Sequence, residues 1–165
     1  MKNTQSINVL GGNENLLRTY EICLSGGLKL FIQYDKEEIT ERQLKAIQER
    51  ISDVITDSID NADVLVEITR PEFSQIINDR IESVENIEKR ANKYKITLKE
   101  ETISAASIQL LKVGYDRLNL QPYDIELIIR IAKVIANMDL SENIEVQHIA
   151  EALQYRANCK KDKNQ

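Results

Sequence analysis

Residue types that could carry catalysis or bind a metal are few in this chain, and their spacing is uninformative. Asp57, Asp60 and Asp63 recur at every third position. A calcium loop instead places oxygen ligands at alternate positions and a Gly at its sharp turn, so a solvated acidic bend fits better. His148 is the only histidine, and no partner for nucleophilic or metal chemistry is evident beside it. We therefore predict no catalytic, cofactor-binding or metal-ligating residue.

The two cysteines indicate a cellular compartment rather than a disulfide or metal site. Cys23 and Cys159 lie far apart in the sequence, so they do not suggest a disulfide framework. With one histidine they are also too few for a four-ligand zinc site. Cys23 falls on an apolar helical face, which is typical of a buried thiol. This cysteine usage favours the reducing cytoplasm.

The composition is that of a globular protein with one ordinary domain or two small ones. The 165 residues are 42% hydrophobic and 30% charged with only 5 Gly and 2 Pro, which excludes collagen-like and broadly disordered classes. No apolar run approaches the roughly 18 residues that a membrane-spanning helix needs. We expect neither membrane insertion nor secretion.

The net charge of −5 is unevenly distributed. Residues 1–80 hold 9 Lys and Arg against 14 Asp and Glu, whereas residues 81–165 hold 13 of each. A duplex-binding surface needs a local excess of Lys and Arg to displace counterions. The only concentrated basic run, Lys160-Lys161-Asp162-Lys163, lies at the C-terminal end and is typical of a solvated tail.

The first 70 residues alternate between helical and strand patterns. A Thr40–Gln43 capping box precedes apolar residues at helical spacing and predicts a helix of about 18 residues. Gly26-Gly27 is suited to stop the preceding helix in a left-handed cap. In chain order we expect a helix over Asn13–Leu24, a strand over Leu28–Tyr34, the capped helix, and a strand over Ala62–Ile68, with both strands in one sheet.

From Pro71 onward the periodicity is helical, which places a domain boundary near residue 70. Four apolar stripes predict four helices that pack as a bundle. Pro122 opens the third helix, and the fourth begins near Glu145. The stripes comprise Phe73, Ile76, Ile77, Ile81, Val84, Ile87, Ala91 and Tyr94, with a break at Ile96-Thr97; Ala105, Ile108, Leu111 and Leu118; Leu127, Ile128, Ile131, Ile135 and Met138; and Ile149, Ala152, Leu153 and Tyr155.

Residues 132–156 read AKVIANMDLSENIEVQHIAEALQYR. This segment closely resembles the C-terminal helical lid of magnesium-chelatase-like AAA+ ATPases, particularly the ComM branch, whose wording is roughly A-R-T-I-A-D-L-E-G-S-E-E-I-x-x-x-H-I-A-E-A-x-Q-Y-R. Weaker similarity extends back to about residue 40. The resemblance implies an α+β, predominantly helical chain. Residues 1–70 would be a small αβ remnant of a degenerate AAA+ core, 71–158 the helical lid, and 159–165 a polar tail.

The activity of the family that this segment resembles is ATP hydrolysis, which requires a Gly-rich phosphate cradle. The cradle pattern G-x-x-x-x-G-K-[S/T] is absent from the chain. Gly11-Gly12 and Gly26-Gly27 lack the following Lys, so both are interpreted as structural turns. Asp35, at the end of an apolar strand, resembles a magnesium-positioning acid but is interpreted as a strand-end residue. The chain length also leaves no room for a complete AAA+ core with its lid.

Two arginines that the resemblance implies are also missing. The family's arginine finger aligns with Ser58, and no Arg occurs between Arg50 and Arg70. The lid's sensor Arg aligns with Tyr123. A neutral hydroxyl supplies neither the fixed charge nor the forked donors of a guanidinium. We therefore expect that the chain does not bind and hydrolyse ATP by the family's mechanism.

These observations lead to alternative functions. The first is a non-catalytic interaction or regulatory module, whose partner is a full-length AAA+ ATPase or a second copy of the chain. The second is a DNA-associated accessory module of the ComM type, against which the acidic first half weighs. The third, an enzyme of unrelated chemistry, would need a deep pocket lined by acidic or His side chains. Salt-dependent DNA binding would distinguish the second from the first.

Overall fold

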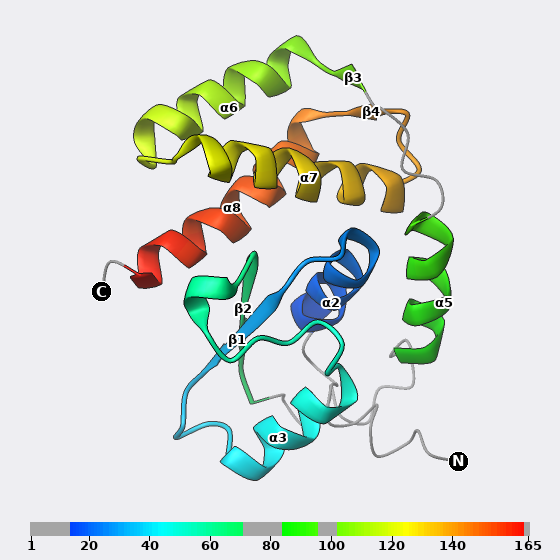
Figure 1. Ribbon diagram of the computed structural model, residues 1–165, viewed down its shortest axis with the longest axis vertical. Helices are drawn as coiled ribbons and strands as arrows, with labels where there is room; N and C mark the ends of the chain where they lie inside the picture. The colour runs from blue at the N-terminus through cyan, green and yellow to red at the C-terminus, as the bar shows by residue number, and fades with distance from the viewer. Residues whose placement is uncertain (1–13, 71–83, 96–101, 164–165) are drawn as a thin grey trace. The chain divides into compact units, whose positions relative to one another are not determined.

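The computed structural model describes residues 14–70, 84–95 and 102–163 (Figure 1). Their contacts divide the chain into two compact units, Met1–Ala91 and Asn92–Gln165. The predicted stripe residues Phe73, Ile76, Ile77 and Ile81, together with Ile96-Thr97 and Gly11-Gly12, lie outside the described residues. The α+β, predominantly helical prediction is confirmed. No helix among the described residues is long and apolar enough to cross a membrane.

The first unit is built around two parallel strands. Strand β1 (Leu30–Tyr34) pairs with β2 (Val64–Ile68) in a register that places Leu30 opposite Val64 and Tyr34 opposite Ile68. Helix α2 (Glu14–Gly26) packs against both strands. Gly27, with a φ of 64°, follows the helix, and the Leu28 N–H donates to the Cys23 carbonyl at 2.9 Å. The predicted left-handed cap, both strands and their common sheet are confirmed.

Helix α3 (Glu41–Arg50) is shorter than predicted. The Thr40–Gln43 capping box is present, but the helix ends at Arg50 rather than continuing for about 18 residues. The Val54 carbonyl accepts the Leu30 N–H at 2.8 Å, and the Thr56 N–H donates to the Leu30 carbonyl at 2.9 Å. Because this pairing with β1 takes the backbone groups, the apolar residues after Arg50 are buried in a turn instead of a helix. A 3₁₀ turn, η1 (Ile59–Asn61), then leads toward β2.

Helix α5 (Val84–Lys95) is attached to the first unit by polar contacts. The Tyr20 hydroxyl donates to Glu88 at 3.2 Å, and the Arg90 Nε donates to Glu21 at 2.7 Å. Arg50 pairs with Glu85. Burial, followed by the nearby Glu88 carboxylate, raises the pKa of Tyr20 well above its ordinary value, so the phenol stays a donor. The first of the four predicted bundle helices therefore contacts α2 and α3 through these pairs.

The Arg90–Glu21 pair yields a stability prediction, because Glu21 is only 4% exposed. Replacing Arg90 by Ala leaves that carboxylate buried without its guanidinium, and we expect the free energy of unfolding to fall by about 1–3 kcal/mol. Urea unfolding at pH 7 measures the change. Lys89→Ala, at an exposed position of the same helix, is the matched control and should change stability little. Equal effects for the two variants would contradict this role of the pair.

From residue 102 to residue 163, the second unit contains the helices α6 (Ala105–Arg117), α7 (Pro122–Met138) and α8 (Val146–Lys163). Helix α8 contacts both α6 and α7. The start of α7 at Pro122 and the start of α8 near Glu145 are confirmed. The core formed by α7 and α8 includes Leu127, Ile128, Ile131, Ile135, Ile149, Ala152 and Leu153, as their spacing predicted.

Helix α6 buries a different face from the one predicted. Of the expected stripe, Leu111 is buried, whereas Ala105, Ile108 and Leu118 are exposed. The buried face instead uses Leu111 with Ser107 and Gly114. A Cβ on Gly114 would lie 2.8 Å from Leu153 Cδ2 on α8. The small residues let α8 approach closely, and this contact selects the buried face over the more apolar one.

Two very short strands in this unit were not predicted from the sequence. Strand β3 (Thr102–Ile103) pairs in parallel with β4 (Asn143–Ile144). The Ile144 carbonyl also accepts the Ser104 N–H at 3.3 Å and the Ser107 hydroxyl at 3.2 Å. Two-residue strands are too short to show an alternating pattern. Their pairing joins the segment before α6 to the α7–α8 connection.

The C-terminal segment differs from the predicted polar tail. Helix α8 continues to Lys163, so residues 159–163 belong to the helix. Cys159 is fully buried, and like Cys23 it is a free thiol. Lys160 pairs with Asp124 at 3.0 Å. An apolar cysteine and a partly covered lysine on one side of the helix end explain why the segment packs instead of extending into solvent.

Leu140, two residues after the last residue of α7, has a left-handed backbone conformation. Its φ is 57°, and the Ser141 N–H donates to the Ala136 carbonyl at 2.9 Å, which is the bond of a glycine-type helix stop. The side chain is 82% exposed, so packing offers little compensation for the strain. In the family wording given above, this position is Gly. The chain therefore adopts a left-handed turn here with a residue that disfavours it.

Leu140→Gly should stabilise the protein. Removing Cβ relieves the left-handed strain of about 1–2 kcal/mol, of which part is offset by the greater freedom of Gly in the unfolded chain. We expect a gain of about 0.5–1 kcal/mol in the free energy of unfolding, measured with urea. Leu118→Gly, at another exposed leucine whose φ of −99° is ordinary, should give no gain. A loss of stability in Leu140→Gly would contradict the interpretation.

Candidate functional site

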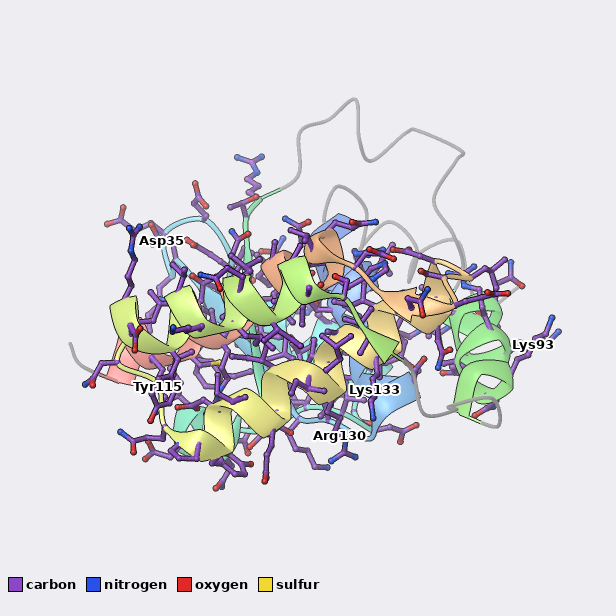
Figure 2. All side chains as sticks on the ribbon, turned by 90° about the horizontal axis from the view of Figure 1, so that it is seen from above. Asp35, Lys93, Tyr115, Arg130 and Lys133 are labelled. Atoms are coloured by element: carbon purple, nitrogen blue, oxygen red, sulfur yellow. The ribbon has the colours of Figure 1, made fainter. Side chains whose placement is uncertain are left out.

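Asp35 lies at the carboxyl end of β1, where a magnesium-positioning acid would be sought. Its side chain is exposed, and its Oδ1 accepts the Glu37 N–H at 2.9 Å (Figure 2). The Asp35 carbonyl accepts the N–H groups of Glu38 and Ile39, each at 3.0 Å. These bonds form the turn that leaves the strand. Asp35 thus has the local contacts of a strand-end residue.

Ser58, which the resemblance aligns with the arginine finger, precedes η1. Its N–H donates to the Thr56 Oγ1 at 3.4 Å, and its carbonyl accepts the Asn61 N–H at 3.1 Å. These contacts shape the turn into β2. The Ser58 side chain offers a neutral hydroxyl at a position that is half-buried. It cannot supply the charge that a phosphate-directed guanidinium would.

The three aspartates around η1 do not share a ligand. Asp63 Oδ2 accepts the Lys29 N–H at 2.9 Å, which joins the start of β2 to the residue before β1. Asp57 and Asp60 are exposed. Within the described ranges, no group of three or more His, Cys, Asp or Glu side chains is arranged to hold a metal ion. Asp63 therefore has a structural contact that the predicted solvated bend did not include.

Tyr123, which the resemblance aligns with the lid's sensor Arg, lies in the first turn of α7 and is 61% exposed. The next residue, Asp124, is fully buried. Its Oδ2 accepts the Gln121 N–H at 2.8 Å and lies 3.0 Å from Lys160 Nζ, and its Oδ1 accepts from Arg156 Nε at 2.9 Å. We call Asp124, Arg156 and Lys160 the Asp124 cluster. It joins the start of α7 to the C-terminal half of α8.

Opposing effects act on the Asp124 carboxyl group. Burial raises its pKa, but the hydrogen bonds from the Gln121 backbone, Lys160 and Arg156 and the Arg156 charge outweigh burial and lower it. Asp124 is therefore ionised in the folded protein, and Arg156, itself 4% exposed, is matched by a buried negative charge. The cluster combines an N-terminal helix cap with an interhelical ion pair.

The cluster predicts a pH-dependent loss of stability. At neutral pH, Asp124→Asn should lower the free energy of unfolding by about 3–5 kcal/mol, because Arg156 stays buried without its carboxylate. The folded-state pKa lies below the unfolded one, so the contribution is complete above the ordinary aspartate range and is lost as the pH falls through the folded-state value. The difference between wild type and variant should therefore shrink in acid.

Urea unfolding from pH 7 into the acid range measures that difference. Asp116→Asn, at an exposed position of α6, is the control for loss of one carboxylate and should change stability little at any pH. A difference between wild type and Asp124→Asn that does not vary with pH would contradict the role of the ionised carboxylate.

His148 has contacts at both ring nitrogens. The imidazole is 1% exposed, and its Nδ1 accepts the Glu145 N–H at 2.9 Å. Its Nε2 lies 3.3 Å from Asp139 Oδ2 at the end of α7. With one nitrogen accepting from the backbone and the other facing a carboxylate, neither is directed at a substrate. The structure assigns His148 a role in joining α7 to α8.

Three of the large apolar side chains that are exposed among the described residues lie on α6 or at its C-terminal end. Ile108 is 56% exposed, Tyr115 42% and Leu118 41%. Ile108 and Tyr115 lie two helical turns apart and Leu118 follows one turn later, so the three form a stripe that we call the α6 stripe. Isolated exposed apolar residues need no explanation, but a stripe at helical spacing is typical of a surface that contacts another molecule.

The outer surface of α7 is charged but mixed in sign. Arg130 and Lys133 lie about one turn apart on this helix (Figure 2). Glu126 is exposed one turn before Arg130 and offsets its charge. At the C-terminal end of α8, Arg156 and Lys160 are engaged with Asp124. This distribution differs from the continuous cationic surface that nucleic acid requires.

The family comparison supports the resemblance seen in the sequence. A family model described as "Magnesium chelatase, subunit ChlI C-terminal" matches residues 71–156, just over half of the chain. The chain belongs to this family, and the matched segment is a magnesium-chelatase-related AAA+ lid. Searches of curated proteins and of solved structures found no match. Helices α6 and α7, most of α8, and α5 all fall within the matched segment.

Proposed function

We propose that this chain is a non-catalytic relative of the magnesium-chelatase-like ATPases that acts as an interaction or regulatory module. The observation that carries the proposal is the combination of a family lid with neutral residues at the two positions of phosphate-directed arginines. Ser58 forms a local turn, and Tyr123 projects from the first turn of α7. The phosphate-cradle pattern does not occur in the 165 residues.

The partner we propose is a full-length AAA+ ATPase of the same family. The α6 stripe supports this choice because it offers an apolar contact surface on the lid itself. Lids and cores of related chains share complementary surfaces by descent, so a lid that retains the fold is suited to contact a ring subunit; this step is an argument from analogy. Membership of the ComM branch and a cytoplasmic location belong to the same proposal.

Complex formation with a full-length family ATPase tests the proposal. At tens of micromolar, we expect the two proteins to co-elute in size-exclusion chromatography. Ile108→Glu should weaken the complex at least about tenfold, because it places a charge in the apolar contact. Gln109→Glu, at an exposed neighbouring position on α6, adds the same charge outside the α6 stripe and should leave binding unchanged. Both variants should unfold at the wild-type temperature.

The other outcomes of this experiment separate the alternatives. Persistent separate elution of chain and ATPase at these concentrations would contradict the proposed partner. A larger species formed by the chain alone, and reduced by Ile108→Glu, would indicate self-association through the same helix. A mobility shift on DNA that weakens steeply with rising salt would instead favour the DNA-associated function.

A further inference from the structure

The connection between α7 and α8 depends on a single imidazole. His148 is the only histidine of the chain and lies in the first turn of α8. The Glu145 carbonyl accepts the His148 N–H at 3.0 Å, and the Glu145 N–H donates back to the His148 Nδ1 at 2.9 Å. The second bond is the half of a capping box in which the side chain of the third helical residue accepts the N-cap N–H, with a histidine in place of the usual Glu or Gln. The imidazole therefore holds the N-terminal end of α8.

The direction of the Glu145 bond determines which ring nitrogen carries the proton. Because Nδ1 accepts a hydrogen bond, the neutral ring must carry its proton on Nε2. Nε2 lies 3.3 Å from Asp139 Oδ2, and the Asp139 N–H donates to the Ile135 carbonyl in the last turn of α7. The neutral imidazole thus accepts a hydrogen bond at the start of α8, while its buried Nε2 faces Asp139 at the end of α7 without forming a hydrogen bond.

We propose that His148 is a pH-sensitive switch whose protonation releases the start of α8 and the adjoining strand β4 from their neutral-pH arrangement. An imidazolium carries a proton on both nitrogens, so Nδ1–H would face the Glu145 N–H, donor against donor. The Glu145 bond is then lost. The new positive charge also lies at the N-terminal end of a helix, where the helix dipole disfavours a cation.

The charged groups around the imidazole determine which of its contacts protonation favours. Asp139, at the end of α7, faces Nε2 and attracts the imidazolium. The flanking carboxylates are Glu145, directly before α8, and Glu151 on α8. Strand β4 and the start of α6 present neutral groups, Ile144 with Ser107 bonded to its carbonyl. Protonation therefore favours the contact with Asp139 and disfavours the one with Glu145.

Loss of the Glu145 hydrogen bond can affect the contacts that hold the start of α6. Glu145 directly follows β4, whose Ile144 carbonyl accepts from both Ser104 and Ser107 at the start of α6. Loss of the Glu145 bond loosens the residue adjoining these contacts. Protonation of His148 thereby loosens β4 and the β3 pairing with it, while the buried core of α7 and α8 stays packed.

Nuclear magnetic resonance of the whole chain tests the switch, and the single histidine makes the imidazole signals unambiguous. At pH 8, the ring nitrogens should show a protonated Nε2 and an unprotonated Nδ1. Between pH 8 and pH 5, the hydrogen-exchange protection factor of the Glu145 amide should fall about tenfold, with the same midpoint as the imidazole titration. The Ile144 and Ser104 amides should shift with that midpoint.

His148→Gln is the informative variant. A glutamine carbonyl can accept the Glu145 N–H in the same capping box but does not titrate, so the amide should stay protected across this range. A proton on Nδ1 at pH 8, a Glu145 amide that remains protected through the imidazole titration, or an imidazole that titrates only on global unfolding would each overturn the proposal. If His148→Gln does not fold, the wild-type titration decides alone.

Discussion

The packing of the second unit depends on a carboxylate that has no access to water. Asp124 is 0% exposed, and such a charge persists inside a protein only when donors surround it. The Gln121 backbone, Arg156 and Lys160 supply those donors, two of them from the C-terminal half of α8. This requirement positions α8 relative to the start of α7. It also engages two cations of α8 in an internal contact.

The pairing of Arg156 and Lys160 with Asp124 is relevant to the question of nucleotide binding. Arg156 is directed inward to Asp124, and Tyr123, which the resemblance aligns with the sensor Arg, offers a neutral hydroxyl at the surface. The apolar side chains left at the surface of α6 are suited to a protein partner. Together these features support the proposal of an interaction role.

Sequence patterns predicted most of the helices and both longer strands, because apolar spacing and capping residues act locally. Helix α7 begins at Pro122 and buries the expected stripe except Met138, which is half-buried. Helix α3 is shorter than its pattern because pairing of residues 54–56 with Leu30 is a long-range event. The buried face of α6 was also mispredicted, since the close approach at Gly114 outweighs the greater apolarity of the opposite face.

The polar contacts could not be predicted from the sequence because their partners lie far apart along the chain. Asp124 and Arg156 are separated by 32 positions, and each taken alone resembles an ordinary solvated charge on a helix. The His148 contacts likewise need the α7–α8 connection to bring Asp139 within 3.3 Å. By contrast, Ser58 and Tyr123 could be singled out beforehand because the resemblance assigns charged residues to those positions.

The central claim is that the family's lid is present here without the groups that grip a triphosphate. Isothermal titration calorimetry with Mg²⁺ and ATP up to roughly 1 mM tests it most directly, with a catalytically competent family ATPase as the positive control. The account predicts no saturable heat for this chain. A saturable one-to-one isotherm in pure material would contradict it.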